Sequence, residues 1–135
     1  MDRLEELCQE GQVGMVYTIP VHHNPTGYTM SNAKRQRLLD LARKYDFMVV
    51  ADEAYQLLNF GAPEVQPLYY HDSAEDPRVV SVGTFSKLIG PGVKVGWIQA
   101  HPSLLKRIAA VGYIESGGNP VTFSSMALLH FVESG

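Results

Sequence analysis

The sequence predicts an α/β protein, in which strands and helices alternate along the chain. Two apolar stretches, Gly14 to Ile19 and Phe47 to Ala51, indicate strands, and a segment with one apolar helical face lies between them. Of the 135 residues, 45% are hydrophobic and 19% are charged, which is an ordinary globular composition. A chain of this length can bury one hydrophobic core, so we expect one domain.

The first predicted strand, Gly14 to Ile19, is rich in β-branched residues and ends at Pro20. A loop rich in turn-forming residues follows it, and Ser31 or Asn32 can then cap a helix. The apolar positions of this helix are Leu38, Leu39, Leu41, Ala42 and Tyr45. Opposite them lie Lys34, Arg35, Arg37, Arg43 and Lys44, which we interpret as a solvated face.

The second strand, Phe47 to Ala51, is continuously apolar, as expected of a strand that is covered on both faces. Between Asn59 and Pro77, prolines, acids, Tyr69 and Tyr70 indicate a long irregular connection over the surface. Further strands are expected at Arg78 to Val82 and Val93 to Ala100. Helices are expected at Ser103 to Ile114 and Thr122 to Glu133, with a break from Gly117 to Pro120 between them.

Charge and composition argue against several classes of function. The chain has 11 basic and 14 acidic residues, so it has no excess positive charge for nucleic acid or an acidic membrane surface. Its apolar runs are far too short to span a bilayer, and it does not begin like a secretory signal. The single cysteine, Cys8, cannot form an internal disulfide, and we expect it to be a buried thiol in a reducing, cytoplasmic compartment.

Two other motifs do not support a binding site. His22 and His23 are adjacent on an extended chain and therefore point in opposite directions, and no cysteine or acidic cluster accompanies them, so no metal site is predicted. The glycines from Gly90 to Gly96 do not match a dinucleotide fingerprint, because a strand rather than a helix follows them.

Polar side chains follow three of the predicted strands. The first strand leads to Asn24, the second to Asp52 and Tyr55, and the third to Thr84, Ser86 and Lys87. Ligands of α/β sheets bind just beyond strand ends. An amide, a carboxylate, a phenol and a lysine at this edge would suit a charged aromatic ligand that carries a carbonyl, a description that fits pyridoxal phosphate (PLP).

The motifs around these residues resemble the large domain of the class I/II aminotransferases, which belong to the fold type I family of PLP enzymes. They are Asn24-Pro25-Thr26-Gly27, Asp52-Glu53-Ala54-Tyr55 and Thr84-Phe85-Ser86-Lys87, followed by Pro91-Gly92 and Lys94. Taken singly, each could be only a turn, a strand end or a solvated loop. Their shared order and spacing make the resemblance specific. The sequence from Tyr113 to Ser125 most resembles the branch of the 2-aminoadipate-type aminotransferases and the regulator-like proteins.

The resemblance implies a fold and a domain organisation. Residues 1–135 would be the central part of a mixed, mostly parallel sheet, and hence a partial large domain. The upstream phosphate-binding segment and the C-terminal small domain of the family would be absent. In the family, the segment corresponding to Gly117 to Pro120 lies near the dimer interface, and a homodimer is expected at full length.

The resemblance also implies roles for the residues around the cofactor ring. Lys87 stands in the family's Schiff-base position, where its amine would also move a proton at the α-carbon of the substrate. Asp52 would face the pyridine nitrogen and keep it protonated. Asn24 and Tyr55 would hydrogen-bond the phenolic oxygen of the ring. For His23, a loop histidine is the default interpretation, although a histidine also precedes this turn in family members.

Three further residues are implied at the cofactor phosphate. The hydroxyl of Thr84 would donate to it, with Ser86 as the lesser candidate. Lys94 stands where the family usually has an arginine that grips the phosphate. A lysine keeps the charge but loses the planar, bidentate fork, and it could instead be a plain surface residue.

The function implied is that of a PLP-dependent transaminase, which moves an amino group from an amino acid to a 2-oxo acid. Two alternatives stay open. The chain could belong to another fold type I protein, either a lyase or the aminotransferase-like effector domain of a transcription regulator. It could also be a shortened, non-catalytic product. The sequence does not specify which amino acid is the substrate.

Overall fold

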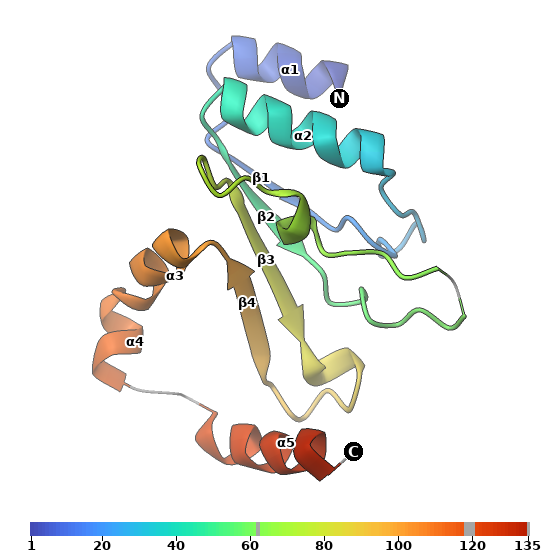
Figure 1. The fold of residues 1–135 in the computed structure, drawn as a ribbon, viewed down its shortest axis with the longest axis vertical. Helices are drawn as coiled ribbons and strands as arrows, with labels where there is room; N and C mark the ends of the chain where they lie inside the picture. The colour runs from blue at the N-terminus through green and yellow to red at the C-terminus, as the bar shows by residue number, and fades with distance from the viewer. Residues whose placement is uncertain (62, 118–120, 135) are drawn as a thin grey trace.

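The computed structural model describes residues 1–61, 63–117 and 121–134 (Figure 1). The strands are β1 (Met15–Thr18), β2 (Met48–Asp52), β3 (Val79–Thr84) and β4 (Gly96–Ala100). The helices are α1 (Asp2–Gln9), α2 (Asn32–Lys44), α3 (Pro102–Ala109), α4 (Gly112–Gly117) and α5 (Thr122–Ser134), with short 3-10 turns η1 (Leu68–His71) and η2 (Phe85–Lys87). None of the helices within these ranges is long and apolar enough to cross a membrane.

The four strands form one sheet in the order β1-β2-β3-β4. β1, β2 and β3 are parallel, and β4 is antiparallel to β3. This arrangement confirms the expected mixed, mostly parallel sheet. The helix α2 provides the crossover between the parallel strands β1 and β2, whereas the shorter connection from β3 allows the chain to turn back into β4.

The core lies between the sheet and two helices that run side by side, α1 and α2 (Figure 1). Its buried members come from both helices, from β2 and the residue before it, from η1 and from β3: Cys8, Leu38, Leu39, Leu41, Ala42, Phe47, Val49, Ala51, Leu68 and Val79. The buried position expected for Cys8 is confirmed. Ser31 caps α2 by accepting a hydrogen bond from the Lys34 backbone N–H, which explains why the helix begins at the next residue.

The opposite face of the sheet is only partly covered. Leu104 of α3 is buried against one end of it, whereas Met15, Tyr17 and Ile98 stay exposed. Because successive side chains of a strand point to opposite faces, Tyr17 of β1 and Asp52 of β2 share this open face. The open face thus carries one of the predicted site residues.

β4 begins at Gly96, three residues later than the sequence predicts. Lys94 has a φ of 55°, so the chain turns at this residue and cannot continue a strand through it. Where β4 then pairs with β3, Trp97 lies opposite Gly83. A Cβ on Gly83 would be 2.3 Å from the Trp97 ring, and only glycine therefore fits beneath it.

Two further predictions on element bounds need correction. The helix expected from Ser103 to Ile114 is divided into α3 and α4, because the chain leaves the helical path between Ala109 and Gly112 and glycine is a weak helix former. α5 extends one residue beyond the predicted helix. Most of the predicted break from Gly117 to Pro120 lies outside the described residues.

The sequence predicts that the connection before β3 runs over the surface, but part of this connection is buried. Leu68 of η1 is fully buried in the core, and Tyr69 packs against the core, whereas Tyr70 stays exposed as expected. The Leu68 backbone N–H donates to the Glu53 carboxylate at 2.7 Å, and the Tyr69 N–H donates to the Ser81 hydroxyl at 3.2 Å. Two buried polar side chains thus hold this segment against the sheet.

Arg35 is not part of a solvated face, contrary to the sequence-based interpretation. Its side chain is fully buried, and it donates to the backbone carbonyls of Met30 (3.0 Å), Gln66 (2.7 Å) and Pro20 (3.4 Å). Met30 and Pro20 lie at the two ends of the loop between β1 and α2, and Gln66 lies in the connection between β2 and β3. The guanidinium therefore joins segments whose approach the helical pattern cannot reveal. Of the other four cations, Lys34, Arg37 and Lys44 are exposed as predicted.

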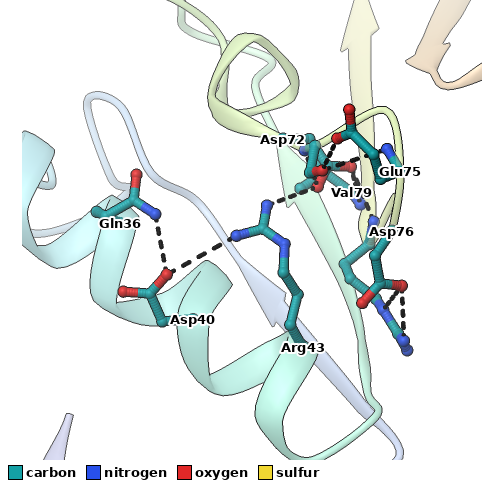
Figure 2. A network of polar contacts seen from close by, with 9 residues as sticks. Gln36, Asp40, Arg43, Asp72, Glu75, Asp76 and Val79 are labelled. Carbon is teal, nitrogen blue, oxygen red and sulfur yellow. Dashed lines mark hydrogen bonds and ion pairs between the residues drawn. The ribbon is translucent and has the colours of Figure 1, made fainter.

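Arg43 is the second cation that leaves the predicted solvated face (Figure 2). Its guanidinium lies 3.3 Å from a carboxylate oxygen of Asp72 and 3.8 Å from one of Asp40. The other Asp72 oxygen accepts hydrogen bonds from the backbone N–H groups of Arg78 and Val79, each at 2.8 Å (Figure 2). Asp72 thus ties the last turns of α2 to the beginning of β3.

The buried carboxyl group of Glu53 should make the free energy of unfolding depend on pH. Burial raises the pKa of its carboxyl, and the charge of Asp52 adds to this, although the bonds from Leu68 and Ser81 and the charge of Arg35 oppose it. A carboxyl whose pKa rises on folding stabilises the fold fully below its unfolded pKa, and this contribution is lost as the pH rises through the folded pKa. We therefore expect the Glu53→Gln chain to gain stability relative to wild type as the pH rises.

Urea unfolding at several values between about pH 4 and pH 8 checks this prediction. Glu75→Gln is the matched control, since burial is not the main influence on this exposed carboxyl, whose pKa is lowered by a hydrogen bond from Ser73. A stability difference between Glu53→Gln and wild type that stays constant over this range, or falls as the pH rises, would contradict it.

Candidate active site

Four of the predicted residues lie at the carboxyl ends of the parallel strands or just beyond them. Asn24 follows β1, Asp52 ends β2, Tyr55 lies in the turn after it, and Lys87 ends η2 directly after β3. The Asn24 amide donates to the Tyr55 hydroxyl at 3.3 Å. The Lys87 Nζ lies 5.7 Å from the centroid of the Tyr55 ring. An amide, a phenol, a carboxylate and an amine are thus assembled at one edge of the sheet.

Asp52 is held from two sides. One oxygen accepts a hydrogen bond from the Ala54 backbone N–H at 3.1 Å, within the turn that begins after β2. The other oxygen accepts a hydrogen bond from the Tyr17 hydroxyl at 2.5 Å. This bond raises the pKa of Tyr17, and burial and the negative charge of Asp52 add to the effect. Tyr17 therefore stays protonated and acts as the donor.

Tyr17 is not among the site residues that the sequence predicts. The residue lies inside the first predicted strand, where an aromatic side chain is ordinary. The signal that could have identified it is strand periodicity, because a tyrosine on the same face as Asp52 of the neighbouring strand can reach that carboxylate. This required the register of β1 against β2, which the sequence does not show.

Thr84 and Ser86 lie beside Lys87, but the Thr84 hydroxyl is already engaged within the loop. It donates to the Val95 carbonyl at 3.2 Å and accepts from the Ser86 backbone N–H at 3.1 Å. It therefore caps η2 and joins this turn to the segment before β4. The Ser86 side chain is half-buried.

Lys94 lies in the connection between η2 and β4 rather than within a strand. Its side chain is exposed, and no polar contact joins it to the other predicted site residues in the part of the chain that the structure describes. The structure thus places Asn24, Asp52, Tyr55 and Lys87 at one edge of the sheet, where Tyr55 contacts both Asn24 and Lys87, and leaves Lys94 apart from them.

The two histidines before the Asn24 turn have separate partners. The His23 ring lies 2.9 Å from the Thr26 hydroxyl, and the His22 ring lies 3.4 Å from the Asn59 amide oxygen. Across residues 1–61, 63–117 and 121–134, no group of three or more histidine, cysteine or acidic side chains could hold a metal ion. A pocket beside the site is lined by His22, Tyr55, Leu58, Asn59 and Phe60.

Residues 1–133 match the family described as aminotransferase class I and II. The chain belongs to this family. Among the curated members, it is 40% identical to the aromatic-amino-acid aminotransferase 1 of Thermococcus litoralis over 99% of its own length and 32% of that protein. It is 35% identical to the 2-aminoadipate transaminase of Thermus thermophilus over 80% of its own length and 28% of that protein.

A solved aminotransferase structure has the same fold. The kynurenine aminotransferase of Pyrococcus horikoshii, solved in complex with PMP, aligns with 99% of this chain and 33% of its own at a TM-score of 0.85 and 32% identity. The expected resemblance to the class I/II aminotransferases, including their 2-aminoadipate branch, is therefore confirmed. The chain spans about a third of the length of these relatives.

Proposed function

We propose that the chain is part of a PLP-dependent aminotransferase, which transfers an amino group from an amino acid to a 2-oxo acid. The observation that carries this proposal is the assembly of Asn24, Asp52, Tyr55 and Lys87 at one sheet edge in a member of this family. In this proposal, residues 1–135 form the cofactor-binding centre of a large domain, and the full-length protein acts as a homodimer.

The groups at the sheet edge fit the cofactor. A carboxylate suits the protonated nitrogen of a pyridine ring, hydroxyl and amide donors suit its phenolic oxygen, and a primary amine suits its aldehyde. When bound, the ring accepts the electron pair that remains after a proton leaves the α-carbon of the amino acid. Each of these groups comes from a different predicted residue. The Tyr55 side chain lies beside two of these residues, Asn24 and Lys87.

Each residue then has a specific task. Lys87 holds the cofactor through its Nζ and, once released, moves the proton at the substrate α-carbon. Asp52 keeps a proton on the ring nitrogen. Asn24 and Tyr55 donate to the phenolic oxygen, and the 3.3 Å hydrogen bond between them keeps both donors in place.

The phosphate would be bound at the other end of the site. The proposed donors are Thr84, Ser86 and Lys94. Because the Thr84 hydroxyl donates to Val95, it can serve the phosphate only by exchanging this partner. In this proposal, the Ser86 hydroxyl and the Lys94 ammonium group are therefore better placed than Thr84 to donate to the phosphate.

Covalent trapping tests the proposal. The purified chain is incubated with PLP and reduced with borohydride, and the modified lysine is located by peptide mass spectrometry. We expect near-stoichiometric modification of Lys87, which Lys87→Ala abolishes. Lys106→Ala, which removes an exposed lysine of α3, is the matched control and should leave the modification unchanged. Modification spread over surface lysines, or none, would contradict the proposal.

Lys94 provides a separate prediction about the phosphate. Replacing Lys94 by arginine restores the planar fork that can bind two phosphate oxygens at once, and we expect it to tighten PLP binding by about three- to tenfold. An absorbance titration of each chain with PLP measures the effect. Lys34→Arg makes the same change on the exposed face of α2 and should have no effect. Equal affinity of the Lys94→Arg and wild-type chains would show that Lys94 does not face the phosphate.

A further inference from the structure

The Tyr17 side chain reaches Asp52 from the neighbouring strand. Tyr17 of β1 pairs in register with Val50 of β2, so that Asp52 lies two residues further along β2 on the same face. Such diagonal neighbours are within reach of an aromatic side chain. The Tyr17 hydroxyl donates across this diagonal to the Asp52 carboxylate at 2.5 Å.

The surroundings of Tyr17 indicate that this bond is its main interaction. The side chain is 58% exposed on the open face of the sheet, so it is not a core residue. Meanwhile the second carboxylate oxygen of Asp52 is occupied by the Ala54 N–H. With one oxygen bonded to its own turn and the other to β1, the carboxylate cannot rotate without breaking a hydrogen bond.

We propose that Tyr17 is a positioning residue of the candidate active site, whose hydroxyl fixes the orientation of the Asp52 carboxylate. This inference rests on the proposed function, because the orientation matters where Asp52 faces a ring nitrogen. A hydrogen bond to the charged form stabilises a carboxylate. The pKa of Tyr17 is raised by this bond, so the phenol keeps its proton and remains the donor.

Cofactor affinity gives the first test. The dissociation constant for PLP is measured by absorbance titration for wild type, Tyr17→Phe and Tyr45→Phe. Tyr45→Phe removes the same atom from a tyrosine whose hydroxyl donates to Glu5, away from the site. We expect Tyr17→Phe to weaken binding about three- to tenfold, in the range of one ordinary hydrogen bond, and Tyr45→Phe to leave it within about twofold.

A double-variant cycle shows whether Tyr17 acts through Asp52. Tyr17→Phe is introduced into the Asp52→Asn chain, in which the carboxylate is already lost. If Tyr17 only positions this carboxylate, the second change should add little, so that the two effects are strongly non-additive. Equal weakening by Tyr17→Phe in both backgrounds would show that Tyr17 acts by another route, and would overturn the inference.

A measurement without cofactor keeps the inference testable if Tyr17→Phe folds poorly. The Tyr17 phenol is titrated by NMR in chains with labelled tyrosine, and we expect its pKa to fall in Asp52→Asn. An unchanged titration would overturn the inference. So would equal PLP affinity of the wild-type and Tyr17→Phe chains, with the proposed function left intact. Failure of wild type to bind PLP at Lys87 would instead overturn the proposed function, and this inference with it.

Discussion

Replacing Asp52 by alanine is expected to weaken PLP binding about 30- to 100-fold, the cost of losing a charge-assisted hydrogen bond in a partly buried site. Proton exchange at the α-carbon of a bound amino acid should fall by at least about a hundredfold, because the residue that holds a proton on the ring nitrogen is gone. Absorbance titration measures the first effect, and NMR in D2O measures the second.

Borohydride trapping distinguishes the role of Asp52 from that of Lys87. At saturating PLP, borohydride should still trap the cofactor on Lys87 in the Asp52→Ala chain, since the amine is unchanged. Asp2→Ala, which removes an exposed carboxylate in the first turn of α1, is the control and should behave as wild type. An Asp52→Ala chain that binds PLP as tightly as the control would mean that Asp52 only ends a strand.

Replacing Arg35 by methionine is expected to destabilise the fold by about 3–5 kcal/mol, as when one partner of a buried charged group is removed. Methionine fills much of the same volume, so that the loss reflects mainly the unpaired groups. These are the carbonyls of Pro20, Met30 and Gln66, together with the buried Glu53 carboxylate, whose charge acts on Arg35. Urea unfolding followed by circular dichroism measures the change.

Arg37→Met is the matched control for this experiment. Arg37 lies two residues further along α2, and its partner is the Glu5 carboxylate at the exposed surface. An exposed ion pair contributes little to stability, so we expect a much smaller loss than for Arg35→Met. Equal losses for the two variants would contradict the structural role assigned to Arg35.

Local patterns predicted most of the secondary structure. β1, β2 and α2 lie where the apolar runs and the helical spacing placed them, and Ser31 caps α2 as expected. These elements depend on interactions between residues near in sequence, and on which face is apolar. The bounds of β4 and α3 were less well predicted, because the left-handed conformation of Lys94 and the interruption before Gly112 have no comparable periodic signal.

The buried polar residues show where pattern reasoning stops. Arg35 and Glu53 are charged, and charged side chains of an amphipathic helix or a strand end are usually solvated. Both are buried here because their partners come from loops distant in sequence, such as Gln66 and Leu68. A helical wheel shows only residues of the helix itself, so it cannot show these contacts. The interpretation of Arg35 as solvated was therefore reasonable from its spacing, but wrong.

By itself, the sequence determined the α/β class, the positions of three parallel strand ends and the motifs by which the chain resembles its family, because these depend on local composition and order. The tertiary structure alone decided the strand register and the approach of the loops. The register places Tyr17 diagonally opposite Asp52, and the loop packing joins Asn24 to Tyr55. Such contacts join residues more than 30 positions apart, and their geometry follows from packing the whole sheet rather than from any local pattern.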